Sequence, residues 1–395
     1  MKSVKRVLVL DAAQRSALAV TRSLGKKGVQ VFTTDEYPTA LAACSRFSKE
    51  YFVCPSPRLH PEHFVTAVAS LCNKQGIDIV FPMTELTTTL LLEKRANLPD
   101  VTIPFPELDR VDSLADKCSL MRLAESMNIP TPRTWHADTP TDLPFDLEEL
   151  PYPLVLKPGK SWLCRHGQWS RNGVRFSSNQ WITKDIVSTD PAFQAHPFLL
   201  QENVSGHGQG IFALYDRGKP LAFFAHRRLR EKPPSGGVSV LSESIPVDEG
   251  ILSHARSLLD EAQWHGVAMV EFKVAEDGTP YLMEVNTRFW GSLQLAIDAG
   301  VDFPYMLYQL ACGTRPEPIN EYKTGKRLRW LLGDVDNLYL TLKDREHYST
   351  RDKLSAILHF MIPSVFRTRH EVNRWNDLGP FWCELRQYMR DISGQ

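Results

Sequence analysis

The stretch that decides the fold reads VEFK at residues 270–273 and YLMEVNTR at residues 281–288. Asp277-Gly278 lies between these two runs, and an Asp-Gly pair between strand-like runs predicts a β-hairpin. When the strands are paired about that turn, Glu271 and Glu284 lie nearly opposite each other. The sequence therefore predicts two facing carboxylates on one sheet.

The second strand of this hairpin carries polar side chains on one face. Because side chains alternate along a strand, Glu284, Asn286 and Arg288 share that face. Met283 and Val285 are expected to point the other way, into a core. Together with the facing carboxylate, the oxygens form a set suited to Mg²⁺, and Arg288 lies ready for a second anion. The alternative is a solvated strand face, where two facing carboxylates would repel each other.

The first hundred residues alternate between strand-like and helix-like runs. Residues 7–10, 29–34 and 77–81 are apolar or β-branched and predict buried strands, whereas residues 14–27 and 61–75 predict helices. Buried strands separated by helices indicate a parallel sheet covered by helices. The N-terminal part is therefore predicted to be an α/β domain.

The turn after the first strand excludes one common ligand of such domains. Residues 11–14 read DAAQ, which lacks the glycines that let a backbone approach the pyrophosphate of NAD. Glu85, just after the strand at 77–81, lies where these folds bind ligands and could receive an amine. A helix N-terminal acid, favoured by the helix dipole, is the alternative interpretation.

Two lysines and one strand end in the middle of the chain are candidates for nucleotide binding. Lys117 follows Asp116 on a helix predicted over about 112–127, and Lys157 ends the strand-like run 153–157. The polar loop after Lys157, residues 158–173, could close over phosphates. A further strand ends in Gln201-Glu202-Asn203-Val204, and a strand end with free backbone groups can bind an adenine edge.

A basic strand follows the first of two predicted hairpins. Residues 211–215 and 220–225 pair about a turn at 216–219, and the second strand continues into Arg227-Arg228-Leu229-Arg230. Alternation would aim Arg228 and Arg230 to the same side, toward a substrate or phosphate. A solvated basic hairpin is the alternative. Beyond residue 320 the chain is predicted to be helical and basic.

In this order along the chain, these elements resemble the ATP-grasp superfamily over roughly residues 1–312. The resemblance rests most on Glu271 and on Glu284-Val285-Asn286-Thr287-Arg288-Phe289-Trp290-Gly291, and is strongest toward carboxylate–amine ligases of the carbamoyl-phosphate-synthase and biotin-carboxylase kind. It implies a fold of the α/β and α+β classes. The chain would consist of a Rossmann-like pre-ATP-grasp domain, a two-lobed ATP-grasp domain and a helical C-terminal extension. The expected ranges are 1–111, 112–312 with a lid at about 135–200, and 313–395.

The resemblance also implies roles for individual residues. Lys117 and Lys157 would hold the α- and β-phosphates of ATP. The hinge residues would bind adenine and ribose, namely Gln201, Glu202, Asn203 and Val204. In place of the small residues usual in the lid loop, this chain has Trp162, Arg165, His166 and Trp169.

The same resemblance implies a metal site and two catalytic cations. Glu271, Glu284 and Asn286 would hold magnesium, with Mn²⁺ as an alternative ion. Arg288 would steady an acyl phosphate, and Arg228 is the second catalytic candidate. The implied reaction activates a carboxylate with ATP and transfers it to an amine. Activation of bicarbonate, formate or carbamate remains an alternative, as does a regulatory protein that binds nucleotide without turnover.

Composition limits the other classes of partner. Lys plus Arg and Asp plus Glu both total 46, so no broad nucleic-acid or membrane surface is indicated. No apolar run approaches the length of about 18 residues that a membrane span needs. The seven cysteines form no C-x-x-C pair, which favours free thiols and a cytoplasmic location. We expect small-molecule acid and amine substrates, and a homo-oligomer is left open.

Overall fold

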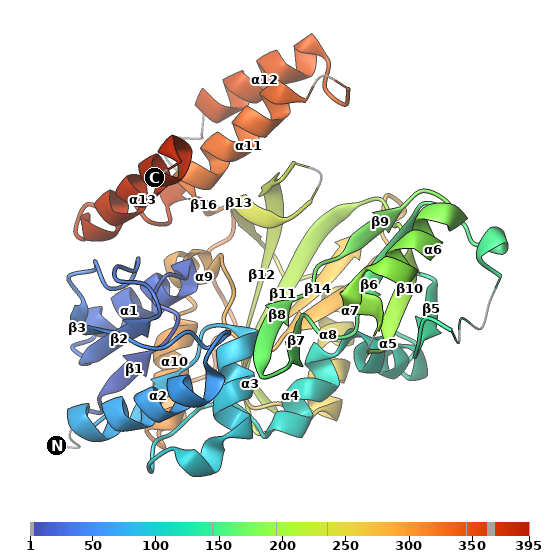
Figure 1. Ribbon diagram of the computed structural model, residues 1–395. Coiled ribbons are helices and arrows are strands. Elements are labelled where there is room, and N and C mark those ends of the chain that lie inside the picture. Colours follow the sequence, from blue (N-terminus) through green and yellow to red (C-terminus); the bar gives the residue numbers. More distant parts are fainter. Residues whose placement is uncertain are drawn as a thin grey trace.

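The computed structural model of the chain describes residues 4–141, 143, 146–194, 196–234, 236–344, 346–361 and 368–394 (Figure 1). The fold mixes helices with four sheets. Within these described ranges, no helix is long and apolar enough to cross a membrane.

The N-terminal sheet has four parallel strands in the order β3-β2-β1-β4, shown in blue in Figure 1. Its parallel pairing confirms the α/β prediction, although the half-exposed strand β3 was not expected. The strands are β1 (Val7–Val9), β2 (Val31–Asp35), β3 (Ser48–Val53) and β4 (Ile79–Phe81). The helices are α1 (Arg15–Lys26), α2 (Pro61–Gln75), α3 (Glu85–Glu93) and the 3₁₀ turn η1 (Arg95–Asn97).

The connection to the next domain contains two helices, α4 (Leu108–Ala115) and α5 (Lys117–Ser126). The prediction of one helix over 112–127 is therefore wrong at Asp116. The Asp116 side chain caps α5 by accepting a hydrogen bond from the backbone N–H of Ser119 at 2.8 Å. An N-cap residue has non-helical backbone angles, so the chain turns there and Lys117 opens the second helix.

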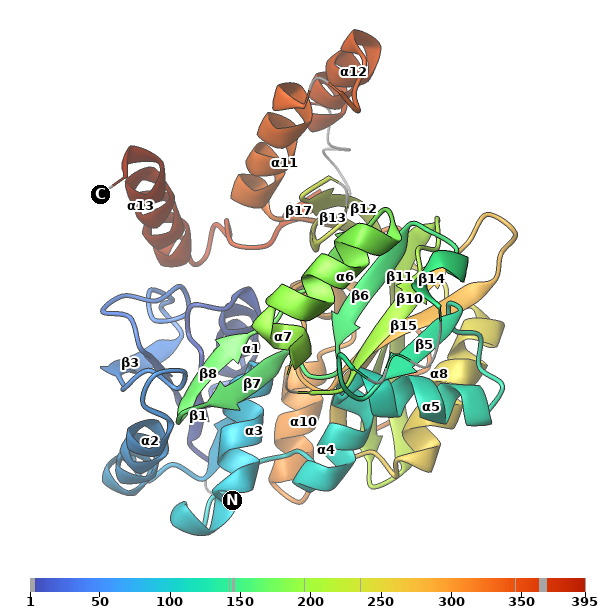
Figure 2. The same cartoon turned by 45° about the vertical axis from the view of Figure 1, so that its right-hand side comes forward.

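A four-stranded antiparallel sheet in the order β5-β10-β6-β9 follows, with its own apolar core. A separate hairpin, β7–β8, extends from it (Figure 2). The elements of this lobe are β5 (Thr134–Ala137), η2 (Leu147–Glu149), β6 (Leu154–Pro158), β7 (Trp162–Arg165), β8 (Gln168–Arg171), β9 (Arg175–Ser177), α6 (Gln180–Thr189), α7 (Pro191–Gln194) and β10 (Phe198–Glu202).

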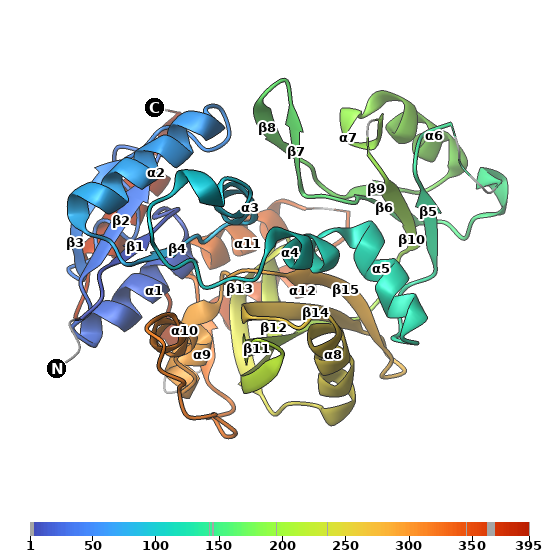
Figure 3. The same cartoon turned by 90° about the horizontal axis from the view of Figure 1, so that it is seen from below.

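The largest sheet has seven strands in the order β15-β14-β11-β12-β13-β16-β17. Viewed from below, it lies opposite the four-stranded sheet β5-β10-β6-β9, which falls in the range predicted as a lid and is called the lid sheet below (Figure 3). Both predicted hairpins are confirmed, as β11–β12 and β14–β15. The elements up to residue 311 are β11 (His207–Asp216), β12 (Lys219–Lys232), β13 (Val238–Ile245), α8 (Glu249–Glu261), β14 (Gly266–Val274), β15 (Pro280–Asn286), α9 (Leu293–Ala299) and α10 (Phe303–Ala311).

The C-terminal part is mainly helical, as expected, but it also adds two strands to the large sheet. β16 pairs with β13, and β17 pairs in parallel with β16. The helices α11 and α12 lie together beyond this edge of the sheet (Figure 1). The elements are β16 (Arg327–Arg329), α11 (Leu331–Lys343), α12 (Thr350–Met361), β17 (Thr368–His370) and α13 (Gly379–Ser393).

The β14–β15 hairpin contains a bulge that the sequence did not reveal. Glu271 pairs with Glu284 but Phe272 pairs with Leu282, so Met283 is an extra residue without a partner in the register. Leu282 and Val285 are buried in the core, whereas Met283 is only partly buried. The prediction that Met283 faces the core is therefore wrong. A bulge of this kind re-aims side chains near functional sites.

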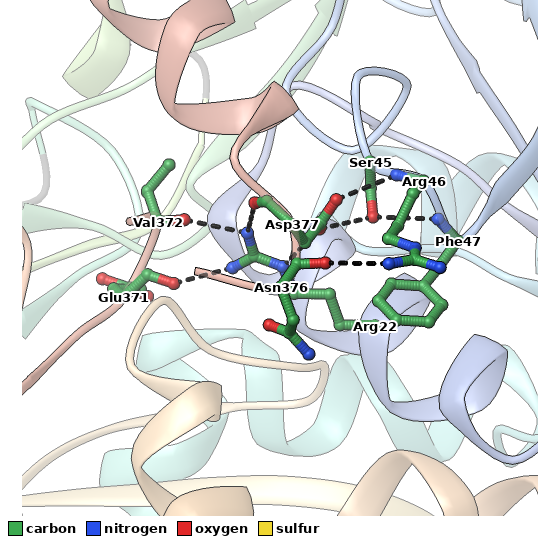
Figure 4. A network of polar contacts seen from close by, with 8 residues as sticks. All are labelled: Arg22, Ser45, Arg46, Phe47, Glu371, Val372, Asn376 and Asp377. Atoms are coloured by element: carbon green, nitrogen blue, oxygen red, sulfur yellow. Dashed lines mark hydrogen bonds and ion pairs between the residues drawn. The ribbon is translucent and has the colours of Figure 1, made fainter. Parts of the chain in front are cut away.

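A buried polar network fixes the C-terminal segment to the N-terminal domain (Figure 4). The guanidinium of Arg22, 2% exposed, donates from Nε to Asp377 Oδ2 at 2.7 Å and from Nη1 to the carbonyl of Glu371 at 2.9 Å. Asp377 also accepts from the hydroxyl of Ser45 at 2.7 Å and from the N–H of Arg46 at 2.9 Å. The first and last parts of the chain are thus packed against each other.

Candidate active site

The two facing carboxylates lie where the sequence predicted them, as direct partners in the β14–β15 register. Burial raises the pKa of Glu271 to about 7, and Glu284 adds to that shift while Arg228 opposes it. Burial also works against ionisation of Glu284, but Lys117 and a hydrogen bond from Asn286 lower its pKa below the ordinary value. The pair therefore consists of one firmly ionised carboxylate and one that holds a proton more readily.

Lys117 approaches this pair from the first turn of α5. Its Nζ lies 3.9 Å from Glu284 Oε2 and donates to the hydroxyl of Ser161 at 3.1 Å. Its backbone N–H donates to the carbonyl of Gly159 at 2.8 Å. Lys117 therefore links the large sheet to the loop that follows β6.

Lys157 approaches from the lid sheet, in β6. Burial lowers its pKa to about 8, Glu284 and Glu271 raise it, and Lys117 lowers it further. These influences show that both lysines and both carboxylates share one electrostatic site, although they come from different elements. The structure thus brings together residues that lie 40 positions apart, since 157 − 117 = 40.

Arg228 provides a third cation, from β12. Its Nη2 lies 2.6 Å from Glu271 Oε2, and its Nη1 donates to Glu231 Oε1 at 2.8 Å. Arg230 does not join it, since it forms two bonds of 2.7 and 2.6 Å with Asp334 of α11. The expectation that both arginines face the same target is therefore wrong, and irregular pairing between Arg228 and Arg230 explains the divergence.

Asn286 ends β15, and Arg288 lies two residues beyond the strand. Asn286 Nδ2 donates to Glu284 Oε1 at 3.0 Å, and Arg288 is close enough to lower the pKa of Glu284. Arg288 Nη1 donates to the carbonyl of Phe289 at 2.8 Å. Phe289 itself is fully buried and packs on Phe81 of β4, with 6.1 Å between ring centroids. This packing fixes the residue next to Arg288.

The predicted hinge lies at the end of β10, beside β6. Leu199 of β10 pairs with Lys157, so the hinge begins two residues beyond the partner of that lysine. Gln201 is 1% exposed and donates from Nε2 to Thr134 Oγ1 at 2.8 Å. Its Oε1 has no hydrogen-bond partner among the described residues. Glu202 is exposed and ends the strand, and Asn203 and Val204 follow it.

The β7–β8 hairpin contacts the N-terminal part of the chain. The backbone N–H of Trp169 donates to the carbonyl of Arg58 at 2.9 Å, and Trp162 and Trp169 pack against the apolar cluster that runs from the N-terminal strands into the large sheet. The unusual large residues of the predicted lid loop are therefore used as an anchor. Glu85 opens α3, in line with the helix-dipole interpretation.

Sequence reasoning missed the partners that position the cations. Ser161 contacts Lys117, and Glu231 contacts Arg228. A signal for Glu231 was present, because it lies three residues from Arg228, but the irregular register of β12 at these residues was not predictable. Ser161 lies 44 residues from Lys117, so no local pattern marks this contact.

The donor set matches the chemistry of a hard divalent cation. Two carboxylates and one amide oxygen belong to Glu271, Glu284 and Asn286, and hard cations prefer such oxygen ligands. No group of three or more His, Cys, Asp or Glu side chains forms a metal cluster in the described part of the chain. The residues present therefore fit magnesium only if the Asn286 amide, water or phosphate oxygens add to the two carboxylates.

Comparisons with known proteins agree on the fold. Residues 194–333 match the family described as ATP-grasp in the biosynthetic pathway with Ter operon. A search of curated proteins gave no match. The chain is similar in structure to L-amino acid ligase from Bacillus licheniformis, with 18% identity and a TM-score of 0.60 over 83% of this chain and 79% of that one.

Two further solved structures have the same architecture. N5-carboxyaminoimidazole synthetase from Staphylococcus aureus is 15% identical, with a TM-score of 0.64 over 88% of this chain and 87% of that one. The biotin carboxylase domain dimer of 2-oxoglutarate carboxylase from Hydrogenobacter thermophilus, in complex with MgADP, ADP and bicarbonate, is 16% identical, with a TM-score of 0.62 over 82% and 73%. The fold of this chain is the ATP-grasp fold, as the sequence motifs predicted.

Proposed function

We propose that this chain, which has the ATP-grasp fold, is an ATP- and Mg²⁺-dependent ligase that activates a carboxylate as an acyl phosphate and joins it to an amine. One observation carries the proposal: cations from three separate elements surround two facing carboxylates. Lys117 lies 3.9 Å from Glu284, and Arg228 lies 2.6 Å from Glu271. The charge of Lys157 interacts with both carboxylates. Phosphoryl transfer needs this kind of positioning and charge neutralisation more than it needs a nucleophilic side chain.

Glu271, Glu284 and Asn286 would hold magnesium in this proposal, with Mn²⁺ as a substitute. When bound, the metal neutralises charge on the transferred phosphoryl group. Glu284 suits this role because Lys117, Asn286 and Arg288 keep it ionised. Glu271 can change partner, from Arg228 to a metal, within the same site.

Lys117 and Lys157 would bind the phosphates of ATP. A Lys157 whose pKa is about 8 still carries its charge near neutrality, and a bound phosphate would hold that charge more firmly. The hinge residues would bind adenine through their backbone groups. They are Gln201, Glu202, Asn203 and Val204. The unpaired Oε1 of Gln201 is a further acceptor at this end of β10.

Arg228 and Arg288 would act on the reacting groups. The substrate carboxylate would attack the γ-phosphate in line, giving an acyl phosphate and ADP. The amine would then attack the acyl carbon, and phosphate would leave through a tetrahedral intermediate. A guanidinium matches the paired oxygens of a carboxylate or phosphate, so each arginine can hold an anionic oxygen in place. The β7–β8 hairpin would exclude water.

The relatives support this class of reaction without naming the substrates. One is an L-amino acid ligase, and others were solved with ADP or with MgADP. We propose small-molecule acid and amine substrates, no nucleic-acid partner and a cytoplasmic location. Assembly into a homo-oligomer is a further proposal, since one relative is described as a dimer. From the resemblance to ATP-grasp proteins, we also propose domain limits of 1–111, 112–312 and 313–395.

Labelled oxygen tests the proposed chemistry. We expect a screen of acid and amine pairs to reveal ADP release, and an acid labelled with ¹⁸O in its carboxylate to give phosphate with one heavy oxygen. Hydroxylamine should trap the activated acid as a hydroxamate. If ADP and product form while the phosphate stays light, ATP activates something other than the acid, for example bicarbonate.

The matched control is Glu284→Gln, which preserves shape and removes the charge. Loss of one electrostatic stabiliser lowers turnover by roughly 10²-fold or more. Near-normal ADP release from this variant would remove the hairpin from the mechanism. A wild-type chain that binds ATP but releases no ADP with any pair would favour the regulatory alternative.

A further inference from the structure

Two cysteines from opposite ends of the chain meet where α13 lies on the N-terminal domain. The carbonyl of Ala40 accepts the backbone N–H of Cys44 at 3.3 Å and the thiol of Cys383 at 3.8 Å. The two thiols are close enough that each is the largest influence on the pKa of the other. Both residues are partly exposed, and they are 339 positions apart, since 383 − 44 = 339.

The start of α13 is pressed against the backbone beside Cys44. A Cβ atom built on Gly379 would lie 2.1 Å from the carbonyl oxygen of Cys44 and 4.0 Å from its Cβ. Only glycine permits this approach. Residues four apart lie on the same face of a helix, so Cys383 follows Gly379 on the face that meets Cys44. The cysteine contact therefore belongs to a packed interface.

The surroundings also favour a reactive thiolate at Cys44. Its contact with Cys383 lowers the pKa of the Cys44 thiol to about 7, with a further contribution from Arg386, while burial opposes the shift. The pKa of Cys383 is raised, first by the same contact. By contrast, burial raises the pKa of Cys72 to about 12. Since thiolates are the reactive species, Cys44 is the expected attacking group.

We propose that Cys44 and Cys383 form a redox-sensitive pair that a hydroperoxide converts into a disulfide between the N-terminal domain and α13. This inference does not depend on the proposed ligase function. It assigns a covalent modification to the C-terminal segment, whose role the sequence left open.

The steps balance with a hydroperoxide as the oxidant. The Cys44 thiolate attacks one peroxide oxygen, an S–O bond forms, the O–O bond breaks, and hydroxide leaves and is protonated. The Cys383 thiol then attacks the sulfur of the sulfenic acid, the S–S bond forms, and the S–O bond breaks. With hydrogen peroxide, two thiols and one peroxide give one disulfide and two waters.

Oxidation of the full-length chain with hydrogen peroxide tests the proposal. Trypsin should place Cys44 in peptide 28–46 and Cys383 in peptide 375–386. After alkylation of the remaining thiols, mass spectrometry without reductant should detect these two peptides joined, and dithiothreitol should separate them. Joining of either peptide to a different cysteine, or no joined peptide at all, would overturn the inference.

Three variants make the result specific. Cys164→Ser removes an exposed thiol elsewhere, and it should leave the 44–383 cross-link unchanged. Cys44→Ser should abolish the cross-link. Cys383→Ser should also abolish the cross-link. In the wild type, dimedone present during a short exposure to peroxide should label Cys44 as a sulfenic acid faster than it labels Cys164 in the same sample. Equal labelling of Cys44 and Cys164 would contradict the assignment of Cys44 as the attacking thiol.

Discussion

Arg228 reaches Glu271 by crossing a glycine on the strand between them. The two residues lie on β12 and β14, on either side of β11, and Nη2 and Oε2 are 2.6 Å apart. A Cβ built on Gly208 of β11 would lie 3.4 Å from Arg228 Cδ, an ordinary contact. The missing side chain at Gly208 leaves the path of the arginine open.

Gly208 therefore offers a graded test of this ion pair. Gly208→Ala should keep near-normal ADP release, because its methyl group fits against Arg228. Gly208→Leu should displace the guanidinium from Glu271 and reduce turnover by roughly 10²-fold, the scale of losing one positioned cation. Equal activity of both variants, with unchanged thermal stability, would show that the position of Arg228 does not serve catalysis.

Lys157 predicts a pH-dependent stability. Burial lowers its pKa to about 8, so below that pH both the folded and the unfolded chain carry the charge, and its burial costs stability. As the pH rises from about 8 toward the ordinary 10.5, the folded chain releases the proton first and this cost shrinks. Lys157→Met should therefore exceed the wild type in free energy of unfolding near neutrality.

The measurement is urea unfolding below and above a pH of about 8. The advantage of Lys157→Met should decrease through this range, because Lys157 titrates there only in the wild type, whereas the other titrating groups are common to both chains. The same variant should bind ATP and Mg²⁺ more weakly by calorimetry. A stability difference that stays constant with pH would place Lys157 in solvent, outside the charged cluster.

Asp377 should be important for stability. Asp377→Ala leaves the guanidinium of Arg22 buried without its counter-ion, and breaking a buried pair in this way costs about 3–5 kcal/mol. Asp78→Ala is the matched control, because Asp78 pairs with the half-exposed Lys5 and should lose much less. Chemical unfolding would measure the free energy of unfolding of both variants. A similar decrease in both would argue against the anchoring role of the network in Figure 4.

The β7–β8 hairpin should respond to nucleotide. Trypsin should cut after the exposed Arg171, and ATP with Mg²⁺ should slow that cut by holding the hairpin over the site. Cutting after Arg351, exposed on the distant helix α12, should keep its rate and serves as the internal control. Trp169→Ala should accelerate cutting at Arg171. If nucleotide leaves the Arg171 rate unchanged, the hairpin does not act as a lid.

The irregular positions show where sequence reasoning reached its limit. The Asp277-Gly278 turn correctly predicted that Glu271 faces Glu284, but not the bulge at Met283. Alternation assumes a regular register, and a bulge adds one residue without any marked change in composition. Asp116 was similarly overlooked, because an N-cap between two helices resembles the interior of one long helix.

The sequence by itself determined the parallel N-terminal sheet, both hairpins and the shared face of Glu284 and Asn286, because these follow from periodicities of a few residues. Only the tertiary structure decided which distant groups meet. It brought Lys157 from the lid sheet toward Glu284, directed Arg228 to Glu271, and placed Cys383 beside Cys44. Such contacts depend on how whole sheets and helices pack, and their energies are not encoded in any local pattern of side chains.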